Sequence, residues 1–326
     1  MERLLSARLL RMLRRIRRPK KPAQIGKHLD KRSVVTILET IQKSAAWLER
    51  HGVPSPRLQA ECLLAHALGL KRLELYLKFD QVVPEPALEQ MRMLLRRRAA
   101  REPLQHLVGT TAFADFELLT TPQALIPRPE TELLLEHASR WLKERLAEPG
   151  APAQPVLLDW GTGSGCLAIG LARQFPAALV TAVDISSEAL SLARQNADKN
   201  GVSDRIHFLL GDGFAALPSE ARFDLVVANP PYIPSAEIQQ LEPEVRDHDP
   251  RLALDGGPDG LDFYRRLAGE GLRRLTDGGS LWLELGHGQA AQVCQIFESS
   301  GWRVIALELD YQRIERVLGV WPATKG

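Results

Sequence analysis

The sequence predicts an α/β fold in which helices cover both faces of a mostly parallel sheet, with a small helical domain before it. From Pro155 onward, apolar runs of strand length alternate with segments of helical periodicity. Alternation of this kind builds a parallel sheet between two helix layers. Between residues 33 and 95 the apolar residues instead recur at intervals of three and four, which is the spacing of helices packed on one another.

The helical domain is expected over residues 33–102, with four helices. Glycine and prolines between Gly52 and Pro56 separate the first two helices, and the stretch from Asp80 to Pro86 separates the third from the fourth. Threonine and aromatic side chains in the stretch that follows are spaced as two short strands. We therefore expect residues 103–128 to link the two domains through a β-hairpin.

The second domain is expected over residues 129–326. Pro129, with acidic residues after it, marks the first turn of the opening helix. The alternation that follows predicts strands at 156–158, 178–183, 206–210, 223–228, 280–285, 302–307 and 316–321. It also predicts helices at 166–175, 188–200, 262–275 and 290–299.

The composition is that of a globular protein with a sizeable core: 326 residues, 44% hydrophobic and 25% charged. No apolar run reaches the roughly 20 residues that cross a membrane. The three cysteines, Cys62, Cys166 and Cys294, lie far apart, which argues against a disulfide framework and a zinc site. We therefore expect no metal, no membrane association and a reducing, cytoplasmic location.

The net charge of +2 conceals a basic extension at the amino terminus. The first 30 residues contain ten Lys and Arg but only two acids, so the rest of the chain is mildly acidic. We expect residues 1–32 to be a flexible tail, with an organellar transit peptide and an RNA contact as alternatives. The acidic remainder argues against stable binding to long nucleic acid, where neutralised phosphates dominate the affinity.

A glycine-rich turn follows the first predicted strand, at Asp159-Trp160-Gly161-Thr162-Gly163-Ser164-Gly165. Glycines let the backbone approach a ligand closely, and the next helix offers unpaired N–H groups at its start. No Lys-Ser or Lys-Thr follows the glycines, which argues against a nucleoside triphosphate. A dinucleotide and S-adenosylmethionine remain, and Asp159 favours the second because a carboxylate repels pyrophosphate and attracts an ammonium group.

Acidic residues also follow the next two predicted strands. Asp184 is placed to accept hydrogen bonds from ribose hydroxyls, although it could instead cap the following helix. Asp212 and Gly213 are expected to flank the adenine, and Phe214 either packs nearby or belongs to the core. Because the carboxyl ends of parallel strands share one edge of the sheet, these loops predict a single cofactor crevice.

The fourth predicted strand ends abruptly at Asn229-Pro230-Pro231-Tyr232. Proline has a fixed φ and no N–H, so the carbonyl oxygens of Asn229 and Pro230 are expected to lack backbone partners. Together with the Asn229 side-chain oxygen, they form rigid acceptors beside an aromatic ring, which suit a planar NH2 group. The alternative is an ordinary turn with a packed tyrosine.

These motifs resemble a class I S-adenosylmethionine-dependent methyltransferase, with a Rossmann-like sheet of seven strands. Pro103–Gly109, Leu125–Glu132 and Pro243–Leu254 make the resemblance narrower, because they are similar to the bacterial release factor glutamine methyltransferases, the PrmC/HemK family. The resemblance covers about residues 33–321 and implies a helical substrate-recognition domain, a hairpin linker and a methyltransferase domain. It also implies methylation of the Gln side-chain amide in the Gly-Gly-Gln motif of peptide chain release factors one and two.

The resemblance implies roles for individual residues. The positions that the resemblance assigns to S-adenosylmethionine, which would leave as S-adenosylhomocysteine, are Gly161, Thr162, Gly163, Ser164, Gly165, Asp184, Asp212 and Gly213. We expect Asp159 and Asn229 to contribute to the cofactor site as well. The substrate positions are Asn229, Pro230, Pro231 and Tyr232, of which the first two would be catalytic. Trp160 departs from the leucine usual at its position, and we expect little effect.

We expect catalysis by alignment, since no His or Lys near the motif is placed to act as a base. Asn229 Oδ1 and the Pro230 carbonyl would accept the two amide hydrogens and direct the nitrogen lone pair at the methyl group. Phe113 of the hairpin either lines the substrate pocket or is hairpin core. Arg128 either acts on the substrate or fixes the corner before its helix. The expected partner is a release factor, bound by a monomeric enzyme.

Three alternatives stay open at this point. Adenine-N6 DNA methyltransferases carry the same tetrapeptide, but they need a basic region that reads bases, and this chain offers none. A glutamine methyltransferase of a ribosomal protein is disfavoured by the stretch from Glu244 to Leu254. A non-catalytic protein that kept the fold is disfavoured by the joint presence of Asp159, the glycines, Asp184 and Asn229.

Overall fold

The computed structural model describes residues 35–323, and those from Thr36 onward form one compact unit. The basic extension predicted for residues 1–32 lies outside the described residues. The helical region comes first and is confirmed, with elements α2 (Ile37–Arg50), α3 (Pro56–Leu68), the 3₁₀ helix η1 (Arg72–Leu77) and α4 (Glu85–Ala99). None of the described helices is long and apolar enough to cross a membrane.

Local signals explain where these helices begin and end. Thr36 and Glu39 form a capping box at the start of α2, in which the backbone N–H of each residue donates to the side-chain oxygen of the other. Gly69 ends α3 in the left-handed conformation that glycine adopts without strain. The helices bury a core of their own, in which Leu48, Leu63, Leu64 and Leu75 are fully buried.

A short helix, α5 (Leu104–Val108), lies inside the stretch predicted as a hairpin linker. It begins after Pro103 and ends at Gly109, whose φ is 80°, and its Leu107 packs into the helical core. The predicted hairpin follows it. Strands β1 (Thr110–Phe113) and β2 (Phe116–Leu119) pair antiparallel, so the linker at 103–128 contains both a helix and a hairpin.

The seven-stranded sheet is confirmed, with the order β5-β4-β3-β6-β7-β9-β8. Its strands are β3 (Val156–Trp160), β4 (Leu179–Asp184), β5 (Ile206–Leu210), β6 (Phe223–Ala228), β7 (Leu275–Glu284), β8 (Trp302–Leu309) and β9 (Glu315–Pro322). The first five run parallel, whereas β9 pairs antiparallel with both β7 and β8. The strand order reverses direction at β3, and a crevice at the carboxyl ends of β3 and β6 is where such sheets bind ligands.

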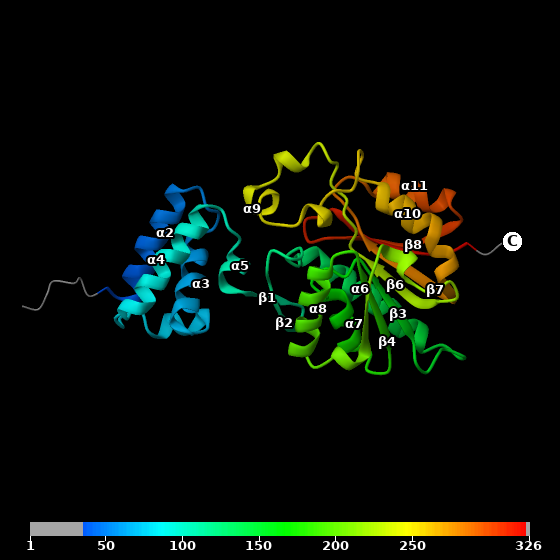
Figure 1. Ribbon diagram of the computed structural model, residues 1–326, viewed down its shortest axis with the longest axis horizontal. Helices are drawn as coiled ribbons and strands as arrows, with labels where there is room; N and C mark the ends of the chain where they lie inside the picture. The colour runs from blue at the N-terminus through cyan, green and yellow to red at the C-terminus, as the bar shows by residue number, and fades with distance from the viewer. Residues whose placement is uncertain (1–34, 324–326) are drawn as a thin grey trace, which may run out of the picture. The chain divides into compact units, whose positions relative to one another are not determined.

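Two helix layers cover the sheet, as Figure 1 shows. One face carries α6 (Pro129–Leu146), α7 (Cys166–Gln174) and α8 (Ser187–Lys199), and the other carries α10 (Asp262–Gly271) and α11 (Ala290–Ser299). Successive strand residues serve opposite layers: Leu157 packs with α6 and α7, whereas Leu158 packs with α10 and α11. Burial on both faces explains why these strands read as continuous apolar runs.

Two predicted boundaries are wrong near the fifth parallel strand. The helix expected at 262–275 ends at Gly271, and β7 starts at Leu275 rather than at 280. A register shift lies between the pairs Phe223–Leu275 and Leu225–Ser280, and the extra residues include Gly278 and Gly279. The glycines break the apolar pattern but allow a β-bulge, so the strand extends across them.

The segment after the Asn-Pro-Pro-Tyr tetrapeptide is held to the helical region by charge pairs. Its short helix α9 (Pro243–Arg246) presents Glu244, whose carboxylate accepts from Arg98 and from Arg101 at 2.6 Å each. Arg98 is only 2% exposed, so Glu244 supplies the partner that a buried guanidinium needs. These contacts fix the residues that close one side of the functional site.

Candidate active site

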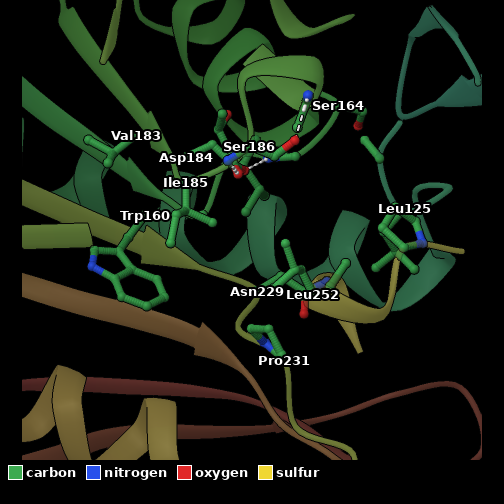
Figure 2. Close-up of a pocket in the computed structure, with 18 of the residues that line it drawn as sticks. Leu125, Trp160, Ser164, Val183, Asp184, Ile185, Ser186, Asn229, Pro231 and Leu252 are labelled. Atoms are coloured by element: carbon green, nitrogen blue, oxygen red, sulfur yellow. Dashed lines mark hydrogen bonds between the residues drawn. The ribbon is translucent and has the colours of Figure 1, made fainter. Parts of the chain in front are cut away.

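Two cavities meet at the carboxyl edge of the sheet. The glycine-loop cavity, about 390 Å³, is lined by residues after β3, β4 and β6, together with Leu125 and Leu252. The Tyr232 cavity, about 260 Å³, is lined by Tyr232, Arg128, Glu130 and Arg316 among others. Asn229, Leu125 and Ala253 line both cavities. Figure 2 shows Asp184 and Ser186 on one side of the glycine-loop cavity and Asn229 and Pro231 opposite them.

The glycine turn is built by backbone hydrogen bonds to the neighbouring strand. The N–H groups of Gly161 and Thr162 both donate to the Val183 carbonyl at 2.9 Å. Gly161 and Gly163 have φ values of 75° and 55°, and a Cβ on either would meet no atom within 4 Å. Glycine is therefore needed here for the left-handed backbone rather than for space. Thr162 and Ser164 line the cavity with Gly161 and Gly163.

Gly165 belongs to the predicted loop but does not line the cavity. It has φ of 85°, and a Cβ there would lie 3.1 Å from the Cβ of Ala193 in α8. The glycine therefore allows the loop to pack closely on a neighbouring helix. Its role in the structure is to position the loop.

Asp184 lies in the cavity wall at the end of β4 and organises both neighbouring loops. Its Oδ2 accepts from the Gly163 N–H at 2.8 Å, and its Oδ1 accepts from the Ser186 N–H at 2.9 Å. The side-chain oxygen of Ser186, rather than Asp184, caps α8 through the Ala189 N–H. Each carboxylate oxygen keeps a lone pair for a ligand hydroxyl.

Asp159 lies behind the glycine turn, 1% exposed, and does not line the cavity. Its Oδ2 accepts from the Thr162 hydroxyl at 2.6 Å and from the Ala168 N–H at 3.0 Å, so it caps α7 from the preceding strand. Its Oδ1 is buried and has no hydrogen-bond partner among residues 35–323. Burial raises the pKa of the carboxyl to about 7, against the two hydrogen bonds to Thr162 and Ala168.

We expect Asp159→Asn to stabilise the ligand-free protein at pH 8 but not below pH 4. The amide oxygen can keep both hydrogen bonds while the uncharged NH2 replaces the unpartnered oxygen. The carboxyl has a higher pKa in the folded protein than in the unfolded chain. Its ionisation therefore lowers the free energy of unfolding of the wild type as pH rises from about 4 to about 7. The variant's advantage should grow by about 3 kcal/mol between pH 5 and pH 8, at roughly 1.4 kcal/mol per pKa unit. Urea unfolding of the wild type and the variant at pH 5 and pH 8 measures the difference between their free energies of unfolding. A difference that is the same at both pH values would contradict the prediction.

The other end of the glycine-loop cavity is walled by aromatic and charged side chains. Trp160 is 4% exposed, lies between Phe214 and Phe263, and carries the Arg266 guanidinium over its ring at 5.7 Å. Arg266 is also bonded to the Asp212 carboxylate. Asp212 and Phe263 line the cavity, whereas Phe214 is core and does not. The core alternative for Phe214 is therefore the one observed.

Gly213 is fitted to Trp160. A Cβ on Gly213 would lie 2.5 Å from the indole Nε1, and the residue has φ of 55°. Any side chain there would displace the indole, so the tryptophan in the glycine loop requires a glycine after the third strand. The absence of a side chain at Gly213 therefore leaves room for the tryptophan at position 160, where leucine is usual.

The expectation that Phe113 lines the substrate pocket needs correction. Its side chain is 1% exposed, stacks edge-on with Phe116 at 5.5 Å, and lies in the core between the hairpin and the sheet. It lines neither cavity. The physical reason is that Phe113 and Phe116 are apolar rings that share a core with residues of α6 and α7. The hairpin is also tied to α8, where Asn196 Oδ1 accepts from the Leu119 N–H at 2.6 Å.

The tetrapeptide follows β6 at the junction of the two cavities. Asn229 Nδ2 donates to the Thr131 hydroxyl at 3.0 Å, while Asn229 Oδ1 has no hydrogen-bond partner among the described residues. The Pro230 carbonyl likewise accepts no hydrogen bond within residues 35–323. Pro231 lines the glycine-loop cavity and Tyr232 the other. The tetrapeptide thus presents unused acceptors, as its prolines predict.

Arg128 lines the Tyr232 cavity and also holds the chain that covers it. Its Nη2 donates to Asp249 Oδ2 at 2.7 Å, and the Asp249 side chain is 1% exposed. Burial raises the pKa of Asp249, against the opposing effect of Arg128. Pro250, Leu252 and Ala253, which follow this anchor, line the glycine-loop cavity. The contact with Asp249 fits the interpretation in which Arg128 fixes the corner before its helix, and a role of Arg128 on the substrate stays a prediction.

Several cavity residues were not predicted from the sequence. Ile185 is 57% exposed although it is a large apolar residue, and it lines the glycine-loop cavity beside Asp184. An exposed isoleucine directly after a strand-end acid is a usable signal. Thr131 and Glu284 join the Asn229 network, and an acid at the end of a predicted strand could have pointed to Glu284. Nothing in the sequence around Leu252 or Phe263 indicates that these residues line the cavity.

In chemical terms, the glycine-loop cavity can hold a nucleoside. Its volume is in the range of ligand pockets, its acid at the end of β4 suits ribose hydroxyls, and Trp160 and Phe263 offer apolar surface for a base. A seven-stranded sheet with this order, a glycine turn after its first strand and an acid after its second is the domain of a class I methyltransferase.

Comparison with known proteins narrows the class to a family. Residues 39–109 match the family model described as PrmC N-terminal domain, and residues 132–242 match the Methyltransferase small domain. The chain is 42% identical over 290 residues to the release factor glutamine methyltransferase of Geobacter sulfurreducens, covering 89% of this chain and 98% of that protein. It is 42% identical over 295 residues to the one of Chlorobaculum tepidum, with the same coverage. The chain belongs to the release factor glutamine methyltransferase family.

A solved structure of the same description is also similar in sequence. The protein-(glutamine-N5) methyltransferase (release factor-specific) of Alicyclobacillus acidocaldarius is 32% identical, covering 63% of this chain and 98% of that chain. The TM-score is 0.37, so this structure adds nothing to the fold assignment, which rests on the observed strand order.

Proposed function

We propose that this chain transfers a methyl group from S-adenosylmethionine to the side-chain amide nitrogen of the glutamine in the Gly-Gly-Gln motif of peptide chain release factors. The observation that carries the proposal is the position of Asn229, which lines both cavities and keeps its Oδ1 free. One cavity suits a nucleoside and the other a narrow side chain. The acceptor between them suits the planar NH2 of an amide.

In this proposal the glycine-loop cavity holds the cofactor. Asp184 accepts from the ribose hydroxyls, Asp212 and Gly213 flank the adenine beside Trp160, and the turn from Gly161 to Ser164 accommodates the remainder. Asp159 acts from behind the turn through its charge and through the loop that it fixes. S-adenosylmethionine supplies a methyl group on a positively charged sulfur, which no residue of the chain can provide.

The glutamine enters through the Tyr232 cavity, presented on an extended loop tip. Asn229 Oδ1 and the Pro230 carbonyl accept its two amide hydrogens, so the nitrogen lone pair turns toward the glycine-loop cavity. Tyr232 packs against the amide plane. A nitrogen–carbon bond forms as the carbon–sulfur bond breaks, and one amide hydrogen leaves as a proton to solvent. Catalysis needs no side-chain base, because alignment supplies what the weak amide nucleophile lacks.

The experiment compares three substrates with a cofactor labelled in its methyl group. These are a release factor, the same factor with Gln→Ala in its Gly-Gly-Gln motif, and duplex DNA rich in adenine. We expect label in the unmodified release factor alone, located on that glutamine by mass spectrometry. Label in DNA alone, or equal label in the Gln→Ala factor, would overturn the proposal.

A further inference from the structure

Asn229 is connected to a buried polar network that the reaction described above does not use. The register of the sheet creates it: Ala228 of β6 pairs with Leu283 of β7, so Asn229 and Glu284 follow at adjacent strand ends. The first turn of α6 adds Thr131. Thr131 is 2% exposed and Glu284 is 1% exposed, so water does not compete for these groups.

The hydrogen bonds in this network have a defined direction. A carboxylate only accepts, so the Thr131 hydroxyl donates its single hydrogen to Glu284 Oε2, at 2.7 Å. The Thr131 oxygen is then an acceptor for its other partner, Asn229, at 3.0 Å. The group of Asn229 that faces Thr131 must therefore be the NH2, which leaves Oδ1 as the free atom.

We propose that Thr131 and Glu284 are positioning residues that orient the carboxamide of Asn229, so that Oδ1 rather than NH2 faces the substrate amide. This inference rests on the proposed function for its catalytic consequence. An Asn229 amide turned by 180° would present two donors to a substrate NH2 that is itself a donor, and the reaction would lose its acceptor. The orientation is thus a condition for activity.

The ionised form of Glu284 is what imposes the direction. A protonated Glu284 could donate to Thr131, which would free the threonine hydrogen to bond Asn229 Oδ1. The groups that face Glu284 are Glu130, Arg316 and Tyr232, besides Thr131, and the Tyr264 hydroxyl donates to its backbone carbonyl. Tyr232 makes only a long contact of 3.4 Å, and Arg316 is engaged by Asp310 and the Leu285 carbonyl. No cation pairs directly with the carboxyl among the described residues.

Burial therefore dominates the titration of this carboxyl. It raises the pKa of Glu284 to about 7, against the hydrogen bond from Thr131. The active orientation is imposed only above this pKa, so the rate should rise with pH through neutrality. Asp159 has a raised pKa of about 7 for the same reason, and a test must separate the two groups.

The sequence offers a direct test, because the chain contains only three asparagines: Asn196, Asn200 and Asn229. In protein labelled with ¹⁵N-asparagine, the side-chain NH2 signals of Asn229 should shift between pH 6 and pH 8. Those of Asn196 and Asn200, which are bonded to backbone carbonyls, should not. Thr131→Val and Glu284→Gln should remove the shift, while Asp159→Asn should keep it. Asn229 signals that neither Thr131→Val nor Glu284→Gln displaces from their wild-type positions at pH 8 would overturn the proposal.

Kinetics at saturating cofactor and release factor provide the second measurement. We expect Thr131→Val to lower kcat by roughly 10- to 100-fold, the size of a misalignment effect, with little change in cofactor affinity. Thr131→Ser should restore the rate, because it returns the hydroxyl. Ser139→Ala, which removes another buried hydroxyl of α6 with no hydrogen-bond partner in residues 35–323, should leave kcat unchanged. A Thr131→Val enzyme with wild-type kcat would overturn the positioning role.

The two measurements separate failure of this inference from failure of the proposed function. If the wild type does not methylate a release factor, the proposed function fails, yet the NMR titration still decides whether Thr131 and Glu284 orient Asn229. If the wild type is active and neither variant displaces the Asn229 signals at pH 8, only the present inference fails.

Discussion

Asn229→Ala will nearly abolish methyl transfer to a release factor while leaving cofactor binding close to that of the wild type. The variant removes the one side-chain acceptor that lines both cavities within residues 35–323. Loss of a preorganised hydrogen-bonding group of this kind costs roughly 100- to 1,000-fold in kcat. Rates at saturating cofactor measure the first effect, and calorimetric titration with S-adenosylmethionine measures the second.

A matched control for this variant is Asn200→Ala. Asn200 follows α8, and its Nδ2 donates to the carbonyls of Glu117 and Asn196, away from both cavities. The control removes the same functional group and should keep the wild-type rate. If Asn229→Ala weakens cofactor binding as much as it lowers the rate, Asn229 belongs to the cofactor site and the assigned catalytic role is wrong.

Asp184→Ala will instead act on cofactor binding. Its carboxylate holds the glycine turn through the Gly163 N–H, holds the start of α8 through the Ser186 N–H, and lines the cavity. Hydrogen bonds to a charged group contribute about 1.5–3 kcal/mol each, so we expect the Kd for S-adenosylmethionine to rise by roughly 100-fold. Calorimetric titration measures it.

The control for this change is Asp204→Ala, which removes an exposed carboxylate in the 3₁₀ helix before β5. Its cofactor affinity should match the wild type. An unchanged Kd in Asp184→Ala would show that the acid at the end of β4 only shapes the loop, and that the ribose is bound elsewhere.

The sequence predicted most of the fold and the central site residues because their signals are local. A proline pair stops a strand wherever it occurs, and a glycine turn after an apolar run bends toward a ligand in any parallel sheet. Asp184, Asp212, Asn229 and Pro231 therefore lie in the cavity walls as expected. The short helix α5 was not predicted, because five residues contain too little periodicity to be recognised.

The residues whose predicted position changed are those whose environment depends on distant segments. Asp159 is in the predicted loop, yet the packing of α7 places its carboxylate behind the turn. Phe113 alternates correctly for a hairpin strand, but the apolar residues of α6 and α7 with which it shares a core bury it. Nothing within a few residues of either position specifies these outcomes.

The sequence by itself determined which strands end in residues with functional side chains. What only the tertiary structure decided is which groups meet, and in which orientation. Thr131 and Glu284 are 153 residues apart, and the register of β6 against β7 brings both to Asn229. The physical reason is that backbone conformation follows from neighbouring residues, whereas burial, hydrogen-bond direction and the pKa of a carboxyl follow from whatever folds against it.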